Sequence, residues 1–371
     1  MPRFVLIPIL VLGLILLLPL PGVIPASLAS AQTYTITDLG TLGGLSSEAL
    51  GLNLAGMVVG VSDTSGTDNQ GNAIRHGFVF ENGQIRDLGS LGGDNSIATG
   101  IDASGRVVGA SDTGQVDQQG AIVTHAFSWA SGVLRDLGTR RGDVDSGAEA
   151  VDERGGVAGW SREWDQALSD YRNWPVTWSV RGAQTIIRTL GRNPGAAHVV
   201  IASGEIGGEV DGDPGVDEAL PVIFTAPPRT QRIILPANDW YCAVYGLNKN
   251  GIAAGYVGSC PPPAGSPVAT LWKHFKRHAL GALPGDCSSL ARGVNKGGET
   301  VGDSWVFSQA PRGFLWDSGR MFDLNTIVAG NSEWHVDSAA AINDRGWIAA
   351  TAHRLVPAAG APRAVLLTPS Q

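Results

Sequence analysis

Three polar residues stand at one position of a repeated sequence, and together they could act on a sugar acid. His198, Tyr245 and Arg292 follow one another at intervals of 47 residues, where the first two repeats carry Leu50 and Thr99. A histidine or a tyrosine can abstract a proton, and an arginine can neutralise the carboxylate on which charge develops. The alternative is that the trio contacts packed side chains and water inside the fold. The three residues are candidates for catalysis, although they complete no known constellation.

A second group of candidates consists of aromatic residues outside the regular positions of the repeats. Their flat faces could stack on a sugar or a peptide, and nearby carboxylates such as Glu163 and Glu333 could accept hydrogen bonds from it. We expect them in loops between strands, where residues are free of core constraints. The alternative is that they pack the loops against one another. The candidate ligand-binding residues are Trp164, Tyr171, Trp174, Trp240, Tyr241, Trp305, Trp334 and His335.

Metal ligands and cysteines give weaker patterns. Asp211, Asp213 and Asp217 place oxygen atoms at intervals that could suit calcium, but the run lacks the glycine and glutamate spacing of a twelve-residue calcium loop. A solvated acidic loop is the alternative, so we predict no cofactor and leave calcium open. Among the three cysteines we predict a Cys242–Cys260 disulfide with Cys287 free. Three reduced thiols, or a Cys260–Cys287 bridge, are the alternatives.

Several classes of enzyme leave no trace in the sequence. There is no Gly-x-Ser-x-Gly elbow, no His-Glu-x-x-His pair, no phosphate loop with lysine and no Cys-x-x-Cys pair. These absences disfavour an enzyme that uses nucleotides or zinc. His76 and His125 recur at the same place in two repeats, which favours a structural hydrogen bond over catalysis.

The elements that must position these residues come from one short phrase that returns at intervals of 47 to 50 residues. It consists of an aliphatic residue, usually Asn or Asp, two turn residues, Gly, three further residues and usually a second Gly. A turn position with positive φ explains the first of these glycines. The seven copies are LNLAGMVVG (52–60), IDASGRVVG (101–109), VDERGGVAG (151–159), VIASGEIGG (200–208), LNKNGIAAG (247–255), VNKGGETVG (294–302) and INDRGWIAA (342–350).

Each repeat predicts four antiparallel strands in two hairpins. In the second repeat the hairpins cover 98–111 and 125–137. The first strand carries small residues and the third carries bulky ones, a taper that suits packing around a shared axis. We therefore predict an all-β fold, a seven-bladed β-propeller of four-stranded blades. Residues 33–40 and 338–368 should share the last blade, so that pairing of the N- and C-terminal strands closes the ring.

The first 31 residues stand apart from the repeats. Arg3, an apolar run from Phe4 to Leu20 and the small residues that end at Ala31 form the pattern of a signal peptide, which we expect to be cut before Gln32. No second run is long enough to span a bilayer. We expect a secreted or periplasmic monomer that forms a single domain over residues 32–371. Loss of Arg3 leaves 25 basic against 34 acidic residues, a net charge of −9 that disfavours nucleic acid as a partner.

DLGTLGG (38–44), DLGSLGG (87–93), HGFVF (76–80) and HAFSW (125–129) resemble the HAF-repeat family of extracellular bacterial proteins. The resemblance extends over residues 32–371 and is weakest around the strands that read WPVTW (174–178) and LPVIF (220–224). It implies export and a repeat architecture, and it transfers no activity.

The recurring residues all have structural explanations, and a fold alone assigns no activity. We therefore predict a non-catalytic binding scaffold whose loop face recognises a glycan, a peptide or a cell-surface polymer. The first alternative is a carbohydrate-active propeller enzyme, a polysaccharide lyase or glycoside hydrolase, that uses His198, Tyr245 and Arg292 or the carboxylates around Trp334. The second alternative is a structural spacer of the cell envelope.

Overall fold

The fold is all-β. The computed structural model describes residues 32–181, 184–212, 218–225, 231–237, 241–258, 266–330, 333–356 and 360–370. The chain divides after Ala31, and all the described residues belong to the unit 32–371. The tight turns and alternating strand patterns of the repeats produce antiparallel hairpins throughout this unit.

Four sheets each contain four consecutive strands in chain order. The first sheet consists of β2 (Gly43–Leu52), β3 (Val58–Thr67), β4 (Ala73–Glu81) and β5 (Gln84–Asp87), and the second of β6 (Ser96–Ile101), β7 (Val107–Val116), β8 (Ile122–Ala130) and β9 (Val133–Asp136). The third consists of β10 (Asp145–Val151), β11 (Gly156–Asp165), β12 (Asp170–Arg181) and β13 (Gln184–Thr189), and the sixth repeat gives β22 (Ser288–Val294), β23 (Thr300–Trp305), β24 (Arg312–Asp317) and β25 (Arg320–Asp323).

The fourth and fifth repeats join into one sheet of eight strands. Its strands are β14 (Gly195–Val200), β15 (Ile206–Asp211), β16 (Ala219–Phe224), β17 (Arg232–Ile234), β18 (Tyr241–Leu247), β19 (Ile252–Gly258), β20 (Val268–Lys273) and β21 (Lys276–Gly281). One parallel pair, Ala219 with Tyr241, connects the two groups of four. The link is available because the short β17 pairs with residues 222–224 of β16 and leaves Ala219 uncovered.

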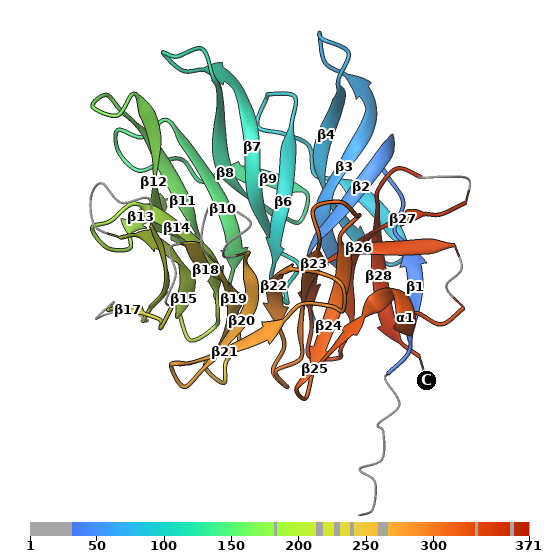
Figure 1. Cartoon of the computed structure of the whole chain (residues 1–371). Coiled ribbons are helices and arrows are strands. Elements are labelled where there is room, and N and C mark those ends of the chain that lie inside the picture. Colours follow the sequence, from blue (N-terminus) through green and yellow to red (C-terminus); the bar gives the residue numbers. More distant parts are fainter. Residues whose placement is uncertain are drawn as a thin grey trace, which may run out of the picture. The chain divides into compact units, whose positions relative to one another are not determined.

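The last sheet is built from both ends of the unit. Its strands are β26 (Trp334–Ile342), β27 (Ile348–Arg354), β28 (Arg363–Pro369) and β1 (Tyr34–Asp38). Ile36 lies opposite Leu367 in an antiparallel register, as the spare strand at the start of the repeats predicted. Figure 1 shows β1, in blue, beside the red β28.

A single helical turn, α1 (Leu324–Ile327), connects β25 to β26, and the side chain of Asp323 caps it by accepting from the Asn325 N–H. Among the described residues, no helix has the length and apolar character needed to cross a bilayer.

The repeated phrase forms the turn between the first and second strands. In the first copy, Asn53 Oδ1 accepts from the N–H groups of Ala55 and Met57, both at 3.0 Å. Gly56 follows with φ at +92°, a region that disfavours residues with a Cβ. The first glycine has a positive φ in all seven copies, as predicted.

The second glycine of the phrase has a different cause. A Cβ on Gly109 would lie 1.9 Å from the carbonyl oxygen of Ile97, in the first strand with which the second strand pairs. The same contact would arise at Gly60, Gly159, Gly208, Gly255 and Gly302.

The apolar core lies between neighbouring sheets. Phe127 of β8 is fully buried and packs with Val59, Val79 and Ala98 from the first two sheets. The third strands of other sheets bury large side chains in the same way, namely Phe78, Trp178, Phe224, Trp272 and Phe314. Small first strands and bulky third strands therefore form the taper that the sequence predicted.

Candidate functional site

Each first strand carries a β-bulge four residues before its turn, and the bulged residue is the one left without a partner in the register. In β14 the register skips His198, between Ala197 and Val199, and in β18 it skips Tyr245, between Val244 and Gly246. A bulge re-aims the side chain of its extra residue. The bulged residues, in chain order, are Leu50, Thr99, Glu149, His198, Tyr245, Arg292 and Ala340.

These bulged residues line one cavity of about 370 Å³, to which β2, β6, β10, β14, β18, β22 and β26 all contribute. Each first strand contacts the next, and β26 contacts β2. Four successive strands provide the titratable side chains Glu149, His198, Tyr245 and Arg292, whereas the other three provide Leu50, Thr99 and Ala340. One side of the cavity therefore carries titratable side chains, and the other side carries none among its bulged residues.

Each of the four titratable side chains contacts a second-strand residue eleven positions later. Trp160 Nε1 donates to Glu149 Oε1 at 3.0 Å, and His198 Nε2 lies in hydrogen-bonding contact with the Glu209 carboxylate. His198 and Glu209 also form an ion pair when the imidazole is protonated.

The other two pairs complete the pattern. Arg292 donates from Nε to Asp303 Oδ2 at 2.7 Å, and Asp303 is buried. The ring of Tyr245 stacks on Tyr256 at a centroid distance of 6.0 Å and lies 4.6 Å from the ring of His198. The pairs place an aromatic and charged cluster along half of the cavity wall.

The surroundings raise the pKa of three of these side chains. Burial raises the pKa of Glu149, and the negative charge of Glu209 adds to the shift. Burial also raises the pKa of Tyr245 to about 12. Burial by itself lowers the pKa of His198, but the charge and hydrogen bond of Glu209, with the charge of Glu149, outweigh it and raise the pKa. A protonated histidine and tyrosine donate hydrogen bonds well but are poor proton acceptors.

The aromatic candidates of the third repeat lie in strands, not in the long loop that we expected. β11 and β12 pair without interruption from Gly156–Ser179 to Asp165–Asp170, so Trp164, Tyr171 and Trp174 belong to one extended hairpin. The turn is tight because Asp165 Oδ1 accepts from the N–H groups at 167 and 168.

Within this hairpin the aromatic rings are tied to neighbouring groups. Trp164 and Tyr171 meet edge to face at 4.9 Å, and the hydroxyl of Tyr171 donates to Asp117 of the second sheet. Trp174 Nε1 donates to Glu163 at 2.9 Å, and the guanidinium of Arg140 lies 4.6 Å from the Trp174 ring. Trp164 also lines a hollow of about 690 Å³.

The remaining aromatic candidates are dispersed over three repeats. Tyr241 begins β18, Trp305 ends β23 and both are half-buried. Trp334 begins β26 with only 8% of its surface exposed, under the guanidinium of Arg354 at 4.5 Å, so little of its ring is free for stacking. His335 is half-buried beside it. Trp240 lies outside the described residues.

The calcium and disulfide predictions fall largely outside the described residues. Asp211 is the exposed last residue of β15, whereas Asp213 and Asp217 are not described. Cys242 is buried in β18, and its predicted partner Cys260 is not described. Cys287 is exposed and has no disulfide within the described residues, and because Cys260 is not described its pairing stays a prediction.

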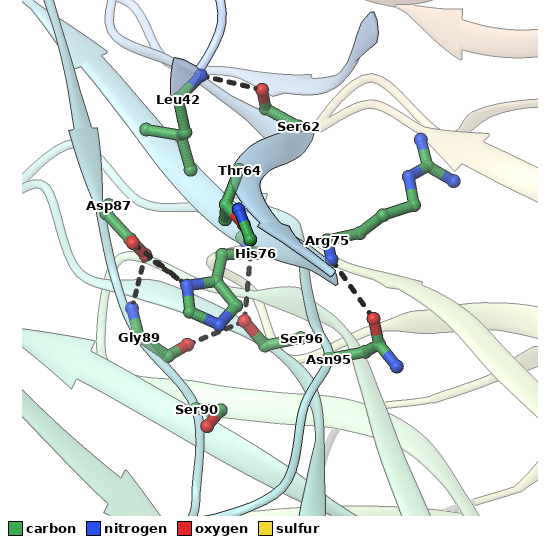
Figure 2. A network of polar contacts seen from close by, with 12 residues as sticks. Leu42, Ser62, Thr64, Arg75, His76, Asp87, Gly89, Ser90, Asn95 and Ser96 are labelled. Atoms are coloured by element: carbon green, nitrogen blue, oxygen red, sulfur yellow. Dashed lines mark hydrogen bonds and ion pairs between the residues drawn. The ribbon is translucent and has the colours of Figure 1, made fainter. Parts of the chain in front are cut away.

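His76 and His125 have the structural role that their recurrence predicted. His76 Nδ1 lies 2.9 Å from both carboxylate oxygens of Asp87, and Figure 2 shows that this aspartate also accepts from the Gly89 N–H, at 2.7 Å. The Gly89 carbonyl accepts from the hydroxyl of Ser96 at 2.6 Å, which connects β5 to the next sheet. His125 makes the same contact with Asp136 at 2.8 Å.

Sequence reasoning placed His198, Tyr245 and Arg292 together but missed Glu149, which occupies the same position of the third repeat. It also missed the partners Trp160, Glu209, Tyr256 and Asp303. The constant spacing of eleven residues could have identified them, but only once the bulge in each hairpin was recognised.

Comparison with known proteins supports the fold. No family model and no curated protein sequence matches the chain. The β-propeller domain of the Trilobed protease from Pyrococcus furiosus aligns over 88% of this chain and 94% of its own, with 8% identity and a TM-score of 0.53. An acylaminoacyl peptidase from Pyrococcus horikoshii aligns over 88% of this chain and 53% of its own, with 8% identity and a TM-score of 0.51. The chain thus has a β-propeller type of fold, and identities this low transfer no activity.

Proposed function

We propose that the protein is a glycan-binding β-propeller, a closed ring of seven blades that holds a sugar residue in the cavity between its first strands. The contacts of β26 with β2 and the pairing of β1 with β28 support closure of the ring. The glycan is bound without being cleaved. The observation that carries the proposal is the meeting of four bulged polar side chains, from four successive blades, in one cavity.

The chemistry of the cavity suits a sugar. Its volume of about 370 Å³ lies in the range of small-ligand sites, about 300–1,000 Å³. Arg292, His198 and Tyr245 offer hydrogen-bond donors to hydroxyl or carboxylate oxygens. The positive charge of Arg292 is balanced by Asp303 and that of a protonated His198 by Glu209, so a neutral or weakly acidic sugar fits better than a highly charged ion.

Binding agrees better with the electrostatics than proton abstraction does. A lyase that used His198 or Tyr245 as its base would need that side chain to release its proton near neutral pH. Their surroundings instead raise the pKa of both groups. The trio is therefore better suited to holding a ligand than to removing its proton.

A glycan array probed with the purified protein and its variants tests the proposal. Arg292→Gln and Tyr245→Phe should weaken retention of the bound glycan by about 10-fold or more, the loss expected when a charged or buried hydrogen bond of about 1.5–3 kcal/mol is removed. Arg345→Gln is the matched control, because this arginine packs on Trp347 outside the cavity. Unchanged retention in both cavity variants, with unchanged melting temperatures, would reject the cavity as the site.

The hairpin of β11 and β12 is a second location for the same activity. Trp164→Ala distinguishes the two, because Trp164 lines its own hollow beside the second sheet. If Trp164→Ala abolishes retention while Arg292→Gln does not, the glycan is bound by the hairpin and not by the cavity.

Glycoside hydrolysis is the second candidate function. Glu149, whose pKa is raised by burial, could donate a proton to a leaving group, and the Glu209 carboxylate is the second acidic group of the cluster. Incubation with a panel of polysaccharides, followed by analysis of the products, tests this candidate. Products that disappear in Glu149→Gln support hydrolysis, and their absence from the wild-type reaction leaves binding alone.

The same proposal includes export of the chain. The predicted cleavage before Gln32 coincides with the division between residues 1–31 and 32–371. Mass spectrometry of the protein recovered outside the cytoplasm should give an N-terminus at Gln32, and recovery of a chain that begins at Met1 would contradict cleavage.

A further inference from the structure

Two histidines face each other at one end of the last sheet, with an aspartate between them. His335 of β26 lies directly opposite His353 of β27, and their rings are 5.1 Å apart. Asp337 Oδ1 lies 3.0 Å from His335 Nδ1 and 2.9 Å from His353 Nδ1, and Asp337 Oδ2 lies 2.9 Å from His353 Nδ1. The three side chains therefore converge through their nitrogen and oxygen atoms.

The aspartate reaches this position because of an extra β-bulge. The register of β26 with β27 skips Asp337, between Val336 and Ser338, in addition to the bulge that faces the cavity. In β6, β10, β14, β18 and β22 the described register contains the cavity bulge alone. A bulge re-aims the side chain of the residue that it leaves without a partner in the register, here Asp337.

We propose that His335, Asp337 and His353 bind a divalent transition-metal ion, with Zn²⁺ as the best match. Imidazole nitrogen and carboxylate oxygen are preferred ligands of zinc, at about 2.0–2.2 Å. One ligand atom from each residue lies within 4.8 Å of the others, close enough for all three to reach a single ion after small side-chain rotations. Three protein ligands leave at least one coordination position for water or another ligand.

An ion can reach the three ligands from the solvent. Between 18% and 23% of each of the three side chains is exposed to solvent. The neighbouring cation, Arg354, does not oppose binding at close range, because its guanidinium is held by Glu333 at 3.1 Å and over the ring of Trp334 at 4.5 Å.

The single-histidine pairs elsewhere in the chain provide a comparison. His76 and His125 each contact one aspartate, and among the described residues no second imidazole contacts the same carboxylate. A structural hydrogen bond needs one imidazole on a carboxylate, whereas Asp337 contacts the imidazoles of both His335 and His353. This contrast distinguishes the site in the last sheet from the recurring contacts of the scaffold.

Coordination of a metal ion through Nδ1 requires a particular tautomer of each imidazole ring. With no ion bound, each Nδ1–H can donate to Asp337, whereas coordination requires the Nδ1 lone pair and leaves the proton of each ring on Nε2. A long-range ¹H–¹⁵N spectrum of the wild-type protein reports this change directly. Addition of one equivalent of Zn²⁺ should shift the ring nitrogens of two histidines, His335 and His353, and leave those of His125 in place.

Titration calorimetry of residues 32–371 with Zn²⁺ gives the stoichiometry and the role of each residue. We expect one bound ion, a higher melting temperature with Zn²⁺ than with chelator, and loss of saturable binding in His335→Gln and in His353→Gln. His125→Gln is the matched control and should keep the site. Either the absence of saturable binding by the wild-type protein, or one bound ion retained in both folded variants, overturns the proposal. If neither variant folds, the wild-type spectrum decides: shifts at other histidines or at none reject the site.

Discussion

Asn343 donates a hydrogen bond from Nδ2 to the carbonyl oxygen of Asn53, at 3.0 Å and in a buried position, although the two residues are 290 positions apart. The bond joins the turn of the last sheet to the turn of the first. The same contact links Asn53 to Asp102 at 3.0 Å, Asn248 to Asn295 at 2.8 Å and Asn295 to Asn343 at 3.2 Å. One side chain of the repeated phrase thus shapes its own turn and holds the neighbouring sheet.

Replacement of Asn343 by Asp should isolate this inter-sheet bond. The variant keeps the oxygen that accepts from the N–H groups of Arg345 and Trp347 but loses the donor to Asn53. We expect the free energy of unfolding to fall by about 1–3 kcal/mol, because a buried carbonyl loses its partner. Urea denaturation measures the change. Asn250→Ala removes an exposed hydrogen bond from the side-chain amide to the Lys296 carbonyl oxygen, and it should lower the free energy of unfolding by less. An equal loss in both variants would contradict the argument.

A cavity in the last sheet should destabilise the whole unit. Leu367 of β28 is fully buried, between a strand from the start of the unit and a strand from its end. Leu367→Ala should lower the free energy of unfolding by about 2–5 kcal/mol through lost burial and the void that remains. Leu45→Ala, at a side chain that is 79% exposed, serves as the control. A similar small loss in both variants would mean that the terminal strands contribute little.

Glu149 should make stability depend on pH in a predictable direction. Its pKa in the folded protein is raised by burial, so the folded state binds the proton more tightly than the unfolded state does. Stability therefore falls as pH rises from the pKa of the unfolded glutamate through that of the folded one. Glu149→Gln removes this loss and should raise the melting temperature relative to wild type more at pH 8 than at pH 4. Glu81→Gln, at an exposed side chain, is the control for the substitution itself, and the same difference at both pH values for Glu149→Gln would refute the assignment.

Gly109 should tolerate no side chain. The Cβ of alanine would lie 1.9 Å from the Ile97 carbonyl oxygen, so β6 and β7 would have to separate. We expect the free energy of unfolding to fall by about 1–3 kcal/mol, the usual cost of overpacking. Gly66→Ala is the control, because its Cβ would meet its nearest atom at 3.4 Å. Equal stability of the two variants in denaturant would show that the strands can move apart freely.

The sequence predicted the features that depend on residues close to one another in the chain. The positive φ of Gly105 and the hairpin of β8 with β9 follow from adjacent residues, and the spacing of the copies then placed β1 beside β28. What it did not reveal depends on the register between strands. A bulge moves one residue out of the ladder, so Glu149 became recognisable as a site residue, and Asp337 as the partner of two histidines, only after the pairing was known. His353 was missed for the same reason, since only the register brings it opposite His335.

The sheet that contains β1 has a consequence for the time course of folding. β1 is synthesised before every other described strand, and its partner β28 after all of them. A nascent chain that lacks β28 cannot complete this sheet, and closing a contact across more than three hundred residues is slow. The sheets whose strands are consecutive in the chain can therefore form before this one does.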